Sequence, residues 1–401
     1  MMHDIFTLDE LKTPNLEHLI PAALGGRKSS KKLINKITNN QLGSAIDAQI
    51  TDAFIMVING LGIESRRGKK AGYAIKPKDG SKYNLGSGFK PELRKPGFRD
   101  EIQNEKRTLS IEARTPDEAK RLLEAARVKY KGMLDEKTLS IQEKQEFIKD
   151  AFPISLSLGG ALQLRAVGKI LFEMSALALG NEIACSSAFD QIRNWILEGV
   201  TYRDEFVSGA RKDLNPMANH DYRVSVWEGL PVLEKAPFQH RVFVFGGKSL
   251  GGAWGCIEFF GHIRFSSLLS TDSSLIDYSY CYLVDSLSDN KLERSDLITA
   301  VTTRHVMQHA VSLSDGRKAL GNLMNEMYKK HMSDLHSQMI DSAMRDCMPK
   351  SGEIITQEHV DKFSRHLAGD FVKHRFQINT EKTLTTADLE AMIKKQDKDK
   401  S

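Results

Sequence analysis

Residues 17–26 combine an acidic residue, a histidine and a double glycine, reading Glu-His-Leu-Ile-Pro-Ala-Ala-Leu-Gly-Gly. This order can place a carboxylate and an imidazole side by side at the end of a short strand. A carboxylate can hold a divalent cation, and a neutral imidazole can take a proton from an attacking water molecule. The segment therefore predicts metal-assisted hydrolysis of a phosphodiester bond.

A second part of the pattern runs from Leu33 to Asp47, reading Leu-Ile-Asn-Lys-Ile-Thr-Asn-Asn-Gln-Leu-Gly-Ser-Ala-Ile-Asp. Together the two parts resemble the start of an HNH endonuclease domain. The branch concerned has the motif Glu-His-Ile-Ile-Pro-x-x-Leu-Gly-Gly, followed by Leu-Ile-Cys-x-x-Cys-Asn-x-x-x-Gly-x-x-Ile-Asp. The resemblance covers about residues 4–50. It implies a small ββα unit that binds a catalytic metal ion.

Four cysteines bind a structural zinc ion in that family, and this chain lacks them. Asn35 and Thr38 stand at two of the positions, and residues 4–16 contain no cysteine where the other pair is expected. We therefore expect no structural zinc. Two interpretations follow: an active nuclease domain held together by packing against the rest of the chain, or a decayed copy that keeps its shape for binding. The retained Glu17–His18 pair favours the first, and the lost cysteines favour the second.

The resemblance also implies roles for individual residues. His18 would be the general base, Glu17 a ligand of a catalytic Mg²⁺ or Mn²⁺ ion, and Asn39 the other protein ligand. A shift of one residue would put Asn40 in the place of Asn39. Asp47 could also reach the metal, although an acidic residue in the first turns of a helix is more often solvated or near a cap.

Basic residues are concentrated in the first quarter of the chain. Residues 1–100 contain 17 Lys or Arg and 10 Asp or Glu, a net charge of +7, which leaves −2 for the other 301 residues. Such a surface attracts a polyanion, with an affinity that falls steeply with salt. Most charge runs only solvate a loop, but the position beside the motif favours DNA as the partner. The expected DNA-binding residues are Arg27, Lys28, Lys31, Lys32 and Lys36, and a second basic cluster is Arg66, Arg67, Lys69 and Lys70.

The composition is ordinary for a globular protein, with 40% hydrophobic and 27% charged residues among 401. The sequence has no run of 18 apolar residues and no basic-then-apolar leader, so it predicts a soluble, cytoplasmic protein with no membrane partner. Its four cysteines lie far apart and are typical of reduced thiols. They are Cys185, Cys256, Cys281 and Cys347.

Local patterns predict an α+β fold, in which a small N-terminal ββα-metal (HNH-like) unit precedes a larger helical and antiparallel-β region. Helices are expected over residues 116–131, after a capping Thr115, and over residues 161–179, ending at Gly180. Runs of β-branched and aromatic residues between 222 and 270, the first at 223–227, predict several antiparallel strands. The expected divisions are a nuclease unit over 1–60, a basic Gly/Pro-rich connector over 61–105, a mixed region with the sheet over 106–290, and a helical region with a charged tail over 291–401.

Charged residues within the apolar segment after residue 160 give a second, weaker likeness to the same branch. Arg165 and Lys169 lie in the expected helix 161–179, and Asp190 and Arg193 lie in the next helical stretch. The branch often has this arrangement after the nuclease motif. These charges could equally flank a packed helix.

The sequence therefore predicts a metal-dependent HNH-type endonuclease that hydrolyses DNA phosphodiester bonds, with a role in defence against foreign DNA that rests on family analogy. The alternative is a catalytically inactive HNH-like protein that binds DNA or regulates another process. A third interpretation is a chance match within a protein-interaction module. The middle and C-terminal regions would select the target, bind a regulatory partner or form a homo-oligomer.

Overall fold

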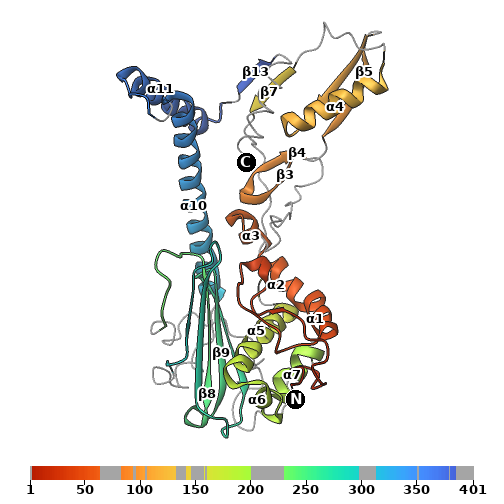
Figure 1. Cartoon of the computed structure of the whole chain (residues 1–401), viewed down its shortest axis with the longest axis vertical. Helices are drawn as coiled ribbons and strands as arrows, with labels where there is room; N and C mark the ends of the chain where they lie inside the picture. The colour runs from red at the N-terminus through yellow and green to blue at the C-terminus, as the bar shows by residue number, and fades with distance from the viewer. Residues whose placement is uncertain are drawn as a thin grey trace. The chain divides into compact units, whose positions relative to one another are not determined.

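The computed structural model of the chain forms two compact units (Figure 1). The first contains residues 1–73 and 154–331, and the second contains residues 74–153 and 332–401. The residues that the structure describes are 2–63, 83–93, 96–103, 106–131, 141–145, 158, 160–199, 230–297, 313–349, 352–378 and 380–384.

A five-stranded antiparallel sheet forms the centre of the first unit, in the order β10-β9-β8-β11-β12. β8, β9 and β10 follow one another as hairpins, and β11 returns to the other side of β8. The strands are rich in aromatic and β-branched residues, which pack well on a pleated surface. Their bounds are β8 (Gln239–Gly247), β9 (Gly252–Phe259), β10 (Ile263–Ser270), β11 (Tyr278–Asp285) and β12 (Lys291–Arg294).

Helix α5 (Ala161–Leu179) packs against this sheet and is buried around most of its circumference. Gly255 in β9 allows the helix to come close, because a Cβ atom there would lie 2.9 Å from the Cβ atom of Leu171. The hydroxyl of Tyr278 in β11 donates a hydrogen bond to the hydroxyl of Ser175 in α5, at 3.1 Å. Helices α6 (Asn181–Ala184) and α7 (Asp190–Glu198) follow, with the short helix η5 (Ser187–Phe189) between them.

A hydrophobic cluster covers the face of the sheet opposite to α5. It is formed mostly by alternate residues of the central strands. Its members are Leu230, Phe243, Phe245, Trp254, Cys256, Cys281 and Leu283. Glu258 on this face binds Arg241 at 2.6 Å and Arg264 at 2.5 Å. β8 and β9 are buried along their whole length, so both faces of the sheet are covered at its centre.

The N-terminal segment forms two short strands followed by helices. β1 (Glu17–His18) pairs antiparallel with β2 (Ser29–Ser30), with the short helix η1 (Ala22–Leu24) between them. The connection needs glycine at Gly26, because a Cβ atom there would lie 1.9 Å from the carbonyl oxygen of Ile20. The helices that follow are α1 (Lys36–Leu42), a π-helical turn η2 (Gly43–Asp47), α2 (Ala48–Ala53) and α3 (Ile55–Leu61). Strand, strand and helix come in the order of a ββα unit, and the identity of this segment as a nuclease unit stays a prediction.

The second unit contains small antiparallel pairs and helices. Helix α4 (Pro116–Lys129) contacts the hairpin of β5 (Gly97–Gln103) and β6 (Lys106–Glu112). The other pairs are β3 (Tyr83–Leu85) with β4 (Pro91–Leu93) and β7 (Ile141–Gln145) with β13 (Thr380–Leu384). The remaining helices are η3 (Ser87–Phe89), α11 (Gln357–Arg375) and the long α10 (Leu313–Cys347), which ends in this unit; η7 (Lys248–Leu250) joins β8 to β9 in the first unit.

The α+β class is confirmed by this mixture of helices and antiparallel sheets. Two helix predictions are also confirmed: the hydroxyl of Thr115 accepts a hydrogen bond from the backbone N–H of Glu118, and Gly180 ends α5. The expected strand 223–227, the basic cluster at 66–70 and the charged tail lie outside the described residues.

The structure divides the chain at other places than the expected boundaries, because the N-terminal segment shares a core with residues far along the sequence. The ring of Phe54 lies 5.1 Å from that of Phe259 and 5.3 Å from that of Phe260. The ring of Phe6 lies 5.6 Å from that of Phe172 in α5. Burial of these aromatic rings stabilises the packing of the N-terminal segment against the rest of the first unit.

Candidate functional site

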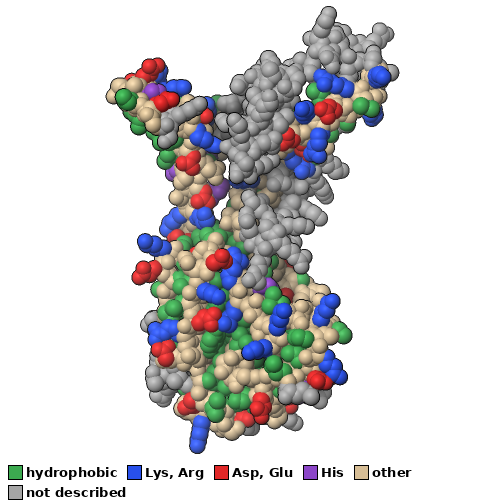
Figure 2. All heavy atoms as spheres, viewed as in Figure 1, with side chains coloured by type: hydrophobic (Ala, Val, Ile, Leu, Met, Phe, Trp, Pro, Cys, Tyr) green, Lys and Arg blue, Asp and Glu red, His purple; other side chains and the backbone are tan. Residues whose placement is uncertain are grey.

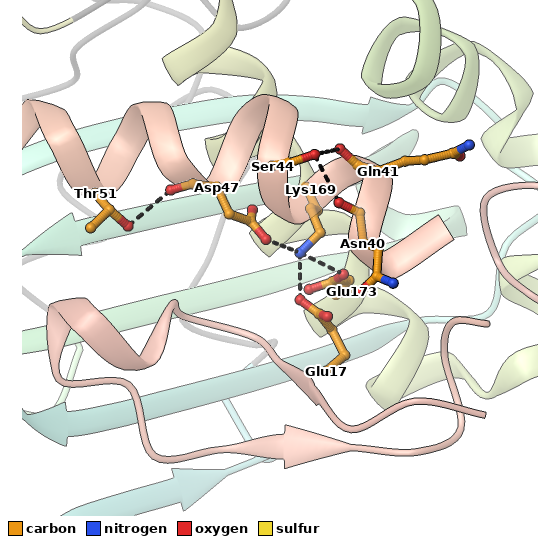
Figure 3. A network of polar contacts seen from close by, with 8 residues as sticks. All are labelled: Glu17, Asn40, Gln41, Ser44, Asp47, Thr51, Lys169 and Glu173. Carbon is orange, nitrogen blue, oxygen red and sulfur yellow. Dashed lines mark hydrogen bonds and ion pairs between the residues drawn. The ribbon is translucent and has the colours of Figure 1, made fainter. Parts of the chain in front are cut away.

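Glu17 lies on β1 with its side chain buried against α5 (Figure 3). Only 3% of the residue is exposed. One carboxylate oxygen accepts a hydrogen bond of 2.5 Å from the ammonium nitrogen of Lys169. This contact joins the N-terminal motif to a helix that lies 152 positions further along the chain.

Two more carboxylates converge on the same ammonium group. Asp47 lies 2.9 Å from the Lys169 nitrogen, and Glu173, one helical turn after Lys169, lies 3.3 Å from it. Asp47 is the last residue of the π-helical turn Gly43–Asp47, which interrupts the regular α-helical hydrogen bonding between α1 and α2. We call Glu17, Asp47, Lys169 and Glu173 the lysine–carboxylate cluster. Figure 3 shows the three acidic side chains directed at one point.

Burial and mutual charge set the protonation of the cluster. Burial raises the pKa of Glu173 well above its ordinary value, and the nearby Lys169 offsets this only in part. Burial also raises the pKa of Glu17, again against the pull of Lys169. Burial alone would lower the pKa of Lys169, but the three carboxylates outweigh it and raise that pKa above its usual range. Lys169 is therefore charged at neutral pH, and Glu173 is the group that most readily keeps a proton.

The expected metal site does not fit this geometry. Glu17 would have to release Lys169 before it could bind an ion, and Asn39 lies on α1 with no hydrogen bond to Glu17 among the described residues. The described residues contain no group of three or more His, Cys, Asp or Glu side chains placed to hold a metal ion. Glu17 thus has a different partner from the one that the motif implies.

His18 follows Glu17 on β1 and is half-buried. Consecutive residues in a strand point to opposite faces, so we expect the imidazole to face away from the lysine–carboxylate cluster. Its backbone pairs with Ser29. His18 and Glu17 are neighbours in the chain, but strand geometry does not direct both side chains at one ion.

Two of the expected DNA-binding residues make contacts within the protein. Arg27 forms an ion pair with Asp289 at 2.9 Å. Lys28 forms one with Glu293 at 2.7 Å, and its ammonium also lies over the rings of Tyr280 and Tyr282, at 5.4 and 5.7 Å from their centres. These contacts fasten the β1–β2 connection to β11 and β12.

The other three expected residues, Lys31, Lys32 and Lys36, are exposed. The net charge of the motif segment itself is zero, because residues 1–63 contain six basic and six acidic residues. The whole surplus of +7 in residues 1–100 therefore belongs to residues 64–100. On the face drawn in Figure 2, basic and acidic side chains of the first unit are interspersed.

Two arginines on otherwise apolar helices, Arg165 and Arg193, have structural roles. Arg165 donates hydrogen bonds to the carbonyl oxygens of Ile196 and Leu197, at 2.6 and 2.7 Å. Arg193 donates to the carbonyl oxygens of Ile5 and Ala184, at 2.7 and 2.8 Å. The sequence shows both as charges on apolar helices, and the structure gives them backbone partners, as a buried charge requires.

His240 has a structural role, which no pattern in the sequence indicated. Its Nε2 atom lies 2.7 Å from the carbonyl oxygen of Leu24, and its Nδ1 atom accepts a bond of 3.3 Å from the backbone N–H of Phe260. The ring is fully buried, and burial lowers its pKa to about 4. A neutral His240 therefore anchors the loop that follows the motif histidine onto β8.

No family model, curated protein or solved structure matches this chain. Among the described helices, none is long and apolar enough to cross a membrane. All four cysteines are free thiols.

Proposed function

We propose that the N-terminal motif segment is a nucleic-acid-binding scaffold that retains the HNH-like order of elements and does not use Glu17 as a metal ligand. The observation that carries this proposal is the 2.5 Å bond between Glu17 and Lys169. It occupies the carboxylate that catalysis by the motif would require. Exposed lysines on the same segment supply the charge for phosphate contacts.

Lys31, Lys32 and Lys36 are the residues that we assign to the phosphate backbone. All three are exposed, and they lie between β2 and the start of α1. Arg27 and Lys28 belong to the fold instead, because Asp289 and Glu293 already neutralise them. The cytoplasm is the compartment that we propose for this function, and the free thiols fit a reducing environment.

A salt series of duplex-DNA binding by the full chain, followed by fluorescence anisotropy, tests the proposal. The triple variant Lys31→Ala/Lys32→Ala/Lys36→Ala should bind more weakly, and its salt slope should fall by about 0.9 for each phosphate group that the variant no longer neutralises. The matched control is Arg27→Gln/Lys28→Gln, from the same loop, which should keep the wild-type slope. Absence of binding by the wild type, or an unchanged slope in the triple variant, would overturn the proposal.

Metal-dependent hydrolysis of DNA is the second candidate. It is favoured by the Glu17–His18 pair at the end of β1 and by the strand–strand–helix order that follows. Plasmid nicking by the wild type and by His18→Ala, with Mg²⁺, Mn²⁺ or EDTA, decides between the two. Cleavage that falls on the order of 10² to 10⁴-fold in His18→Ala would support a general base. Equal cleavage by both proteins, or none with any ion, would remove this candidate.

A further inference from the structure

Helix α4 in the second unit has one apolar face and one basic face. The apolar face packs on the β5–β6 hairpin, with Ala126 and Tyr130 buried. Residues 119–131 contain five basic residues and one acidic residue, a net charge of +4. The five basic residues, which we call the basic face of α4, are all exposed: Lys120, Arg121, Arg127, Lys129 and Lys131. Lys and Arg side chains gather along α4 in Figure 2.

The helix dipole accounts for only part of this charge. Cations are stabilising in the last turn of a helix, where Arg127 and Lys129 lie. Lys120 and Arg121 lie in the first half of α4, where the dipole does not favour a positive charge. Such a concentration of one sign attracts a partner of the opposite sign.

Hydrogen bonds fix both ends of α4. At the start of the helix, the hydroxyl of Thr115 accepts a bond of 3.2 Å from the backbone N–H of Glu118. At its end, the hydroxyl of Tyr130 donates a bond of 3.1 Å to the carboxylate of Asp100 in β5. The basic face is therefore held on a fixed helix, which reduces the conformational entropy lost on binding.

Two small apolar side chains lie among the basic residues. Val128 is 79% exposed, and Ala125 is also exposed. Val128 is two residues after the buried Ala126, so it lies on nearly the opposite side of the helix. The rise of the helix places Arg121 and Lys129 about 12 Å apart along its axis, and the major groove of B-form DNA is also about 12 Å wide. Small apolar side chains at the centre of such a helix can contact the methyl groups of thymine.

We propose that α4 binds in the major groove of duplex DNA. Lys120, Arg121 and Lys129 contact the phosphate groups of the two strands, and Ala125 and Val128 face the base edges. This is a second nucleic-acid surface, in the second unit, and it does not rest on the exposed lysines of the motif segment. An RNA duplex does not admit the helix in this way, because the major groove of A-form RNA is deep and narrow.

The acidic residue of this stretch, Glu124, is exposed and lies one helical turn after Lys120. A carboxylate on a helix in the major groove can accept a hydrogen bond from the amino group of cytosine. Its position is thus compatible with a contact to bases, although it would oppose binding to a phosphate group.

The test measures binding of the full chain to a DNA duplex and to an RNA duplex of the same sequence, by fluorescence anisotropy over a salt series. Lys120→Ala/Arg121→Ala should reduce the salt slope for DNA by about 0.9 for each lost phosphate contact and leave the RNA slope unchanged. The charge-conserving Lys120→Arg/Arg121→Lys should keep the wild-type slope. Val128→Asp, which places an anion in the groove, should weaken binding to DNA and not to RNA.

The matched control is Lys362→Ala/Arg365→Ala, which removes two exposed basic residues from α11 in the same unit and should keep both slopes. Circular dichroism should show the same helix content in every variant, because substitutions at exposed positions change stability little. The loss caused by Lys120→Ala/Arg121→Ala should also appear in a chain that lacks the lysines of the motif segment, so the two surfaces are tested separately. An unchanged DNA slope, equal losses on DNA and RNA, or a loss of binding only to anionic lipid vesicles would overturn the proposal.

Discussion

Acidification should protonate His240 and so weaken the attachment of the β1–β2 connection to β8. The ring is buried between the backbone of Leu24 and that of Phe260, and its ring centre lies 4.5 Å from that of Phe260. Burial lowers the pKa of His240 from 6.5 to about 4, and the bond to the Leu24 carbonyl opposes this only in part. The folded protein therefore resists a proton that the unfolded chain accepts.

The magnitude follows from the shift. Each pKa unit corresponds to roughly 1.4 kcal/mol, so the change from 6.5 to about 4 removes about 3 kcal/mol from the free energy of unfolding. Because the folded-state pKa of this base is depressed, the stabilisation is complete above pH 6.5. It is lost as the pH falls from about 6.5 to about 4.

Urea unfolding followed by tryptophan fluorescence measures this loss of stability in the first unit, which contains His240. The three tryptophans, at positions 195, 227 and 254, all belong to the first unit. The control is His240→Gln, which can still donate to the Leu24 carbonyl but does not titrate. The gap in stability between wild type and His240→Gln should narrow by about 3 kcal/mol from pH 7 to pH 4. A gap that stays constant over this range would refute the assignment of His240 as a buried neutral anchor.

Three further predictions concern the same unit. Gly26→Ala should lower the free energy of unfolding by about 1–3 kcal/mol or more, because the added Cβ atom overpacks the β1–β2 connection. Gly43→Ala is the control and should be tolerated, since Gly43 is helical and a Cβ atom there would have one neighbour, at 3.9 Å. Urea unfolding compares the two variants, and equal stabilities would contradict the tight packing at Gly26. The raised pKa of Glu173 makes the folded state hold a proton that the unfolded state has lost, so the stability of the wild type should fall as pH rises above 4.5, and Glu173→Gln should weaken this fall. Glu198→Gln, at an exposed position, is the control. A Glu173→Gln pH profile identical to that of the wild type would contradict the raised pKa. Elemental analysis of the purified chain should find no stoichiometric zinc, and one zinc per chain that persists after mild chelation would contradict this.

The sequence predicts the local elements well and the long-range contacts poorly. The strands between residues 239 and 270 and the helix 161–179 follow from residue type and periodicity. The bond from Glu17 to Lys169 joins positions 152 residues apart, and periodicity contains no information about such a pairing. Lys169 and Glu173 lie on the buried side of α5, so the motif residues alone supplied only half of the cluster.

The ion pairs of Arg27 and Lys28 are also long-range contacts that the sequence does not reveal. Their position beside the glycine pair made them look like a phosphate-binding run, yet their acidic partners come from β12 and the loop before it. Only the exposed Lys31, Lys32 and Lys36 keep the role that the sequence suggested, as a proposal. A single sequence shows where charges lie along the chain and not which of them are paired in the fold.

Glu17 is the buried partner of Lys169, and a double-mutant cycle tests this pairing most directly. Lys169→Met should cost about 3–5 kcal/mol, the usual penalty for leaving buried charges unpaired. Glu17→Gln should cost less, because Asp47 and Glu173 still face the ammonium. If the claim is right, Lys169→Met/Glu17→Gln is more stable than Lys169→Met alone, since one uncompensated carboxylate has gone. Effects that add within about 0.5 kcal/mol would mean that the two side chains do not interact, and would contradict the account.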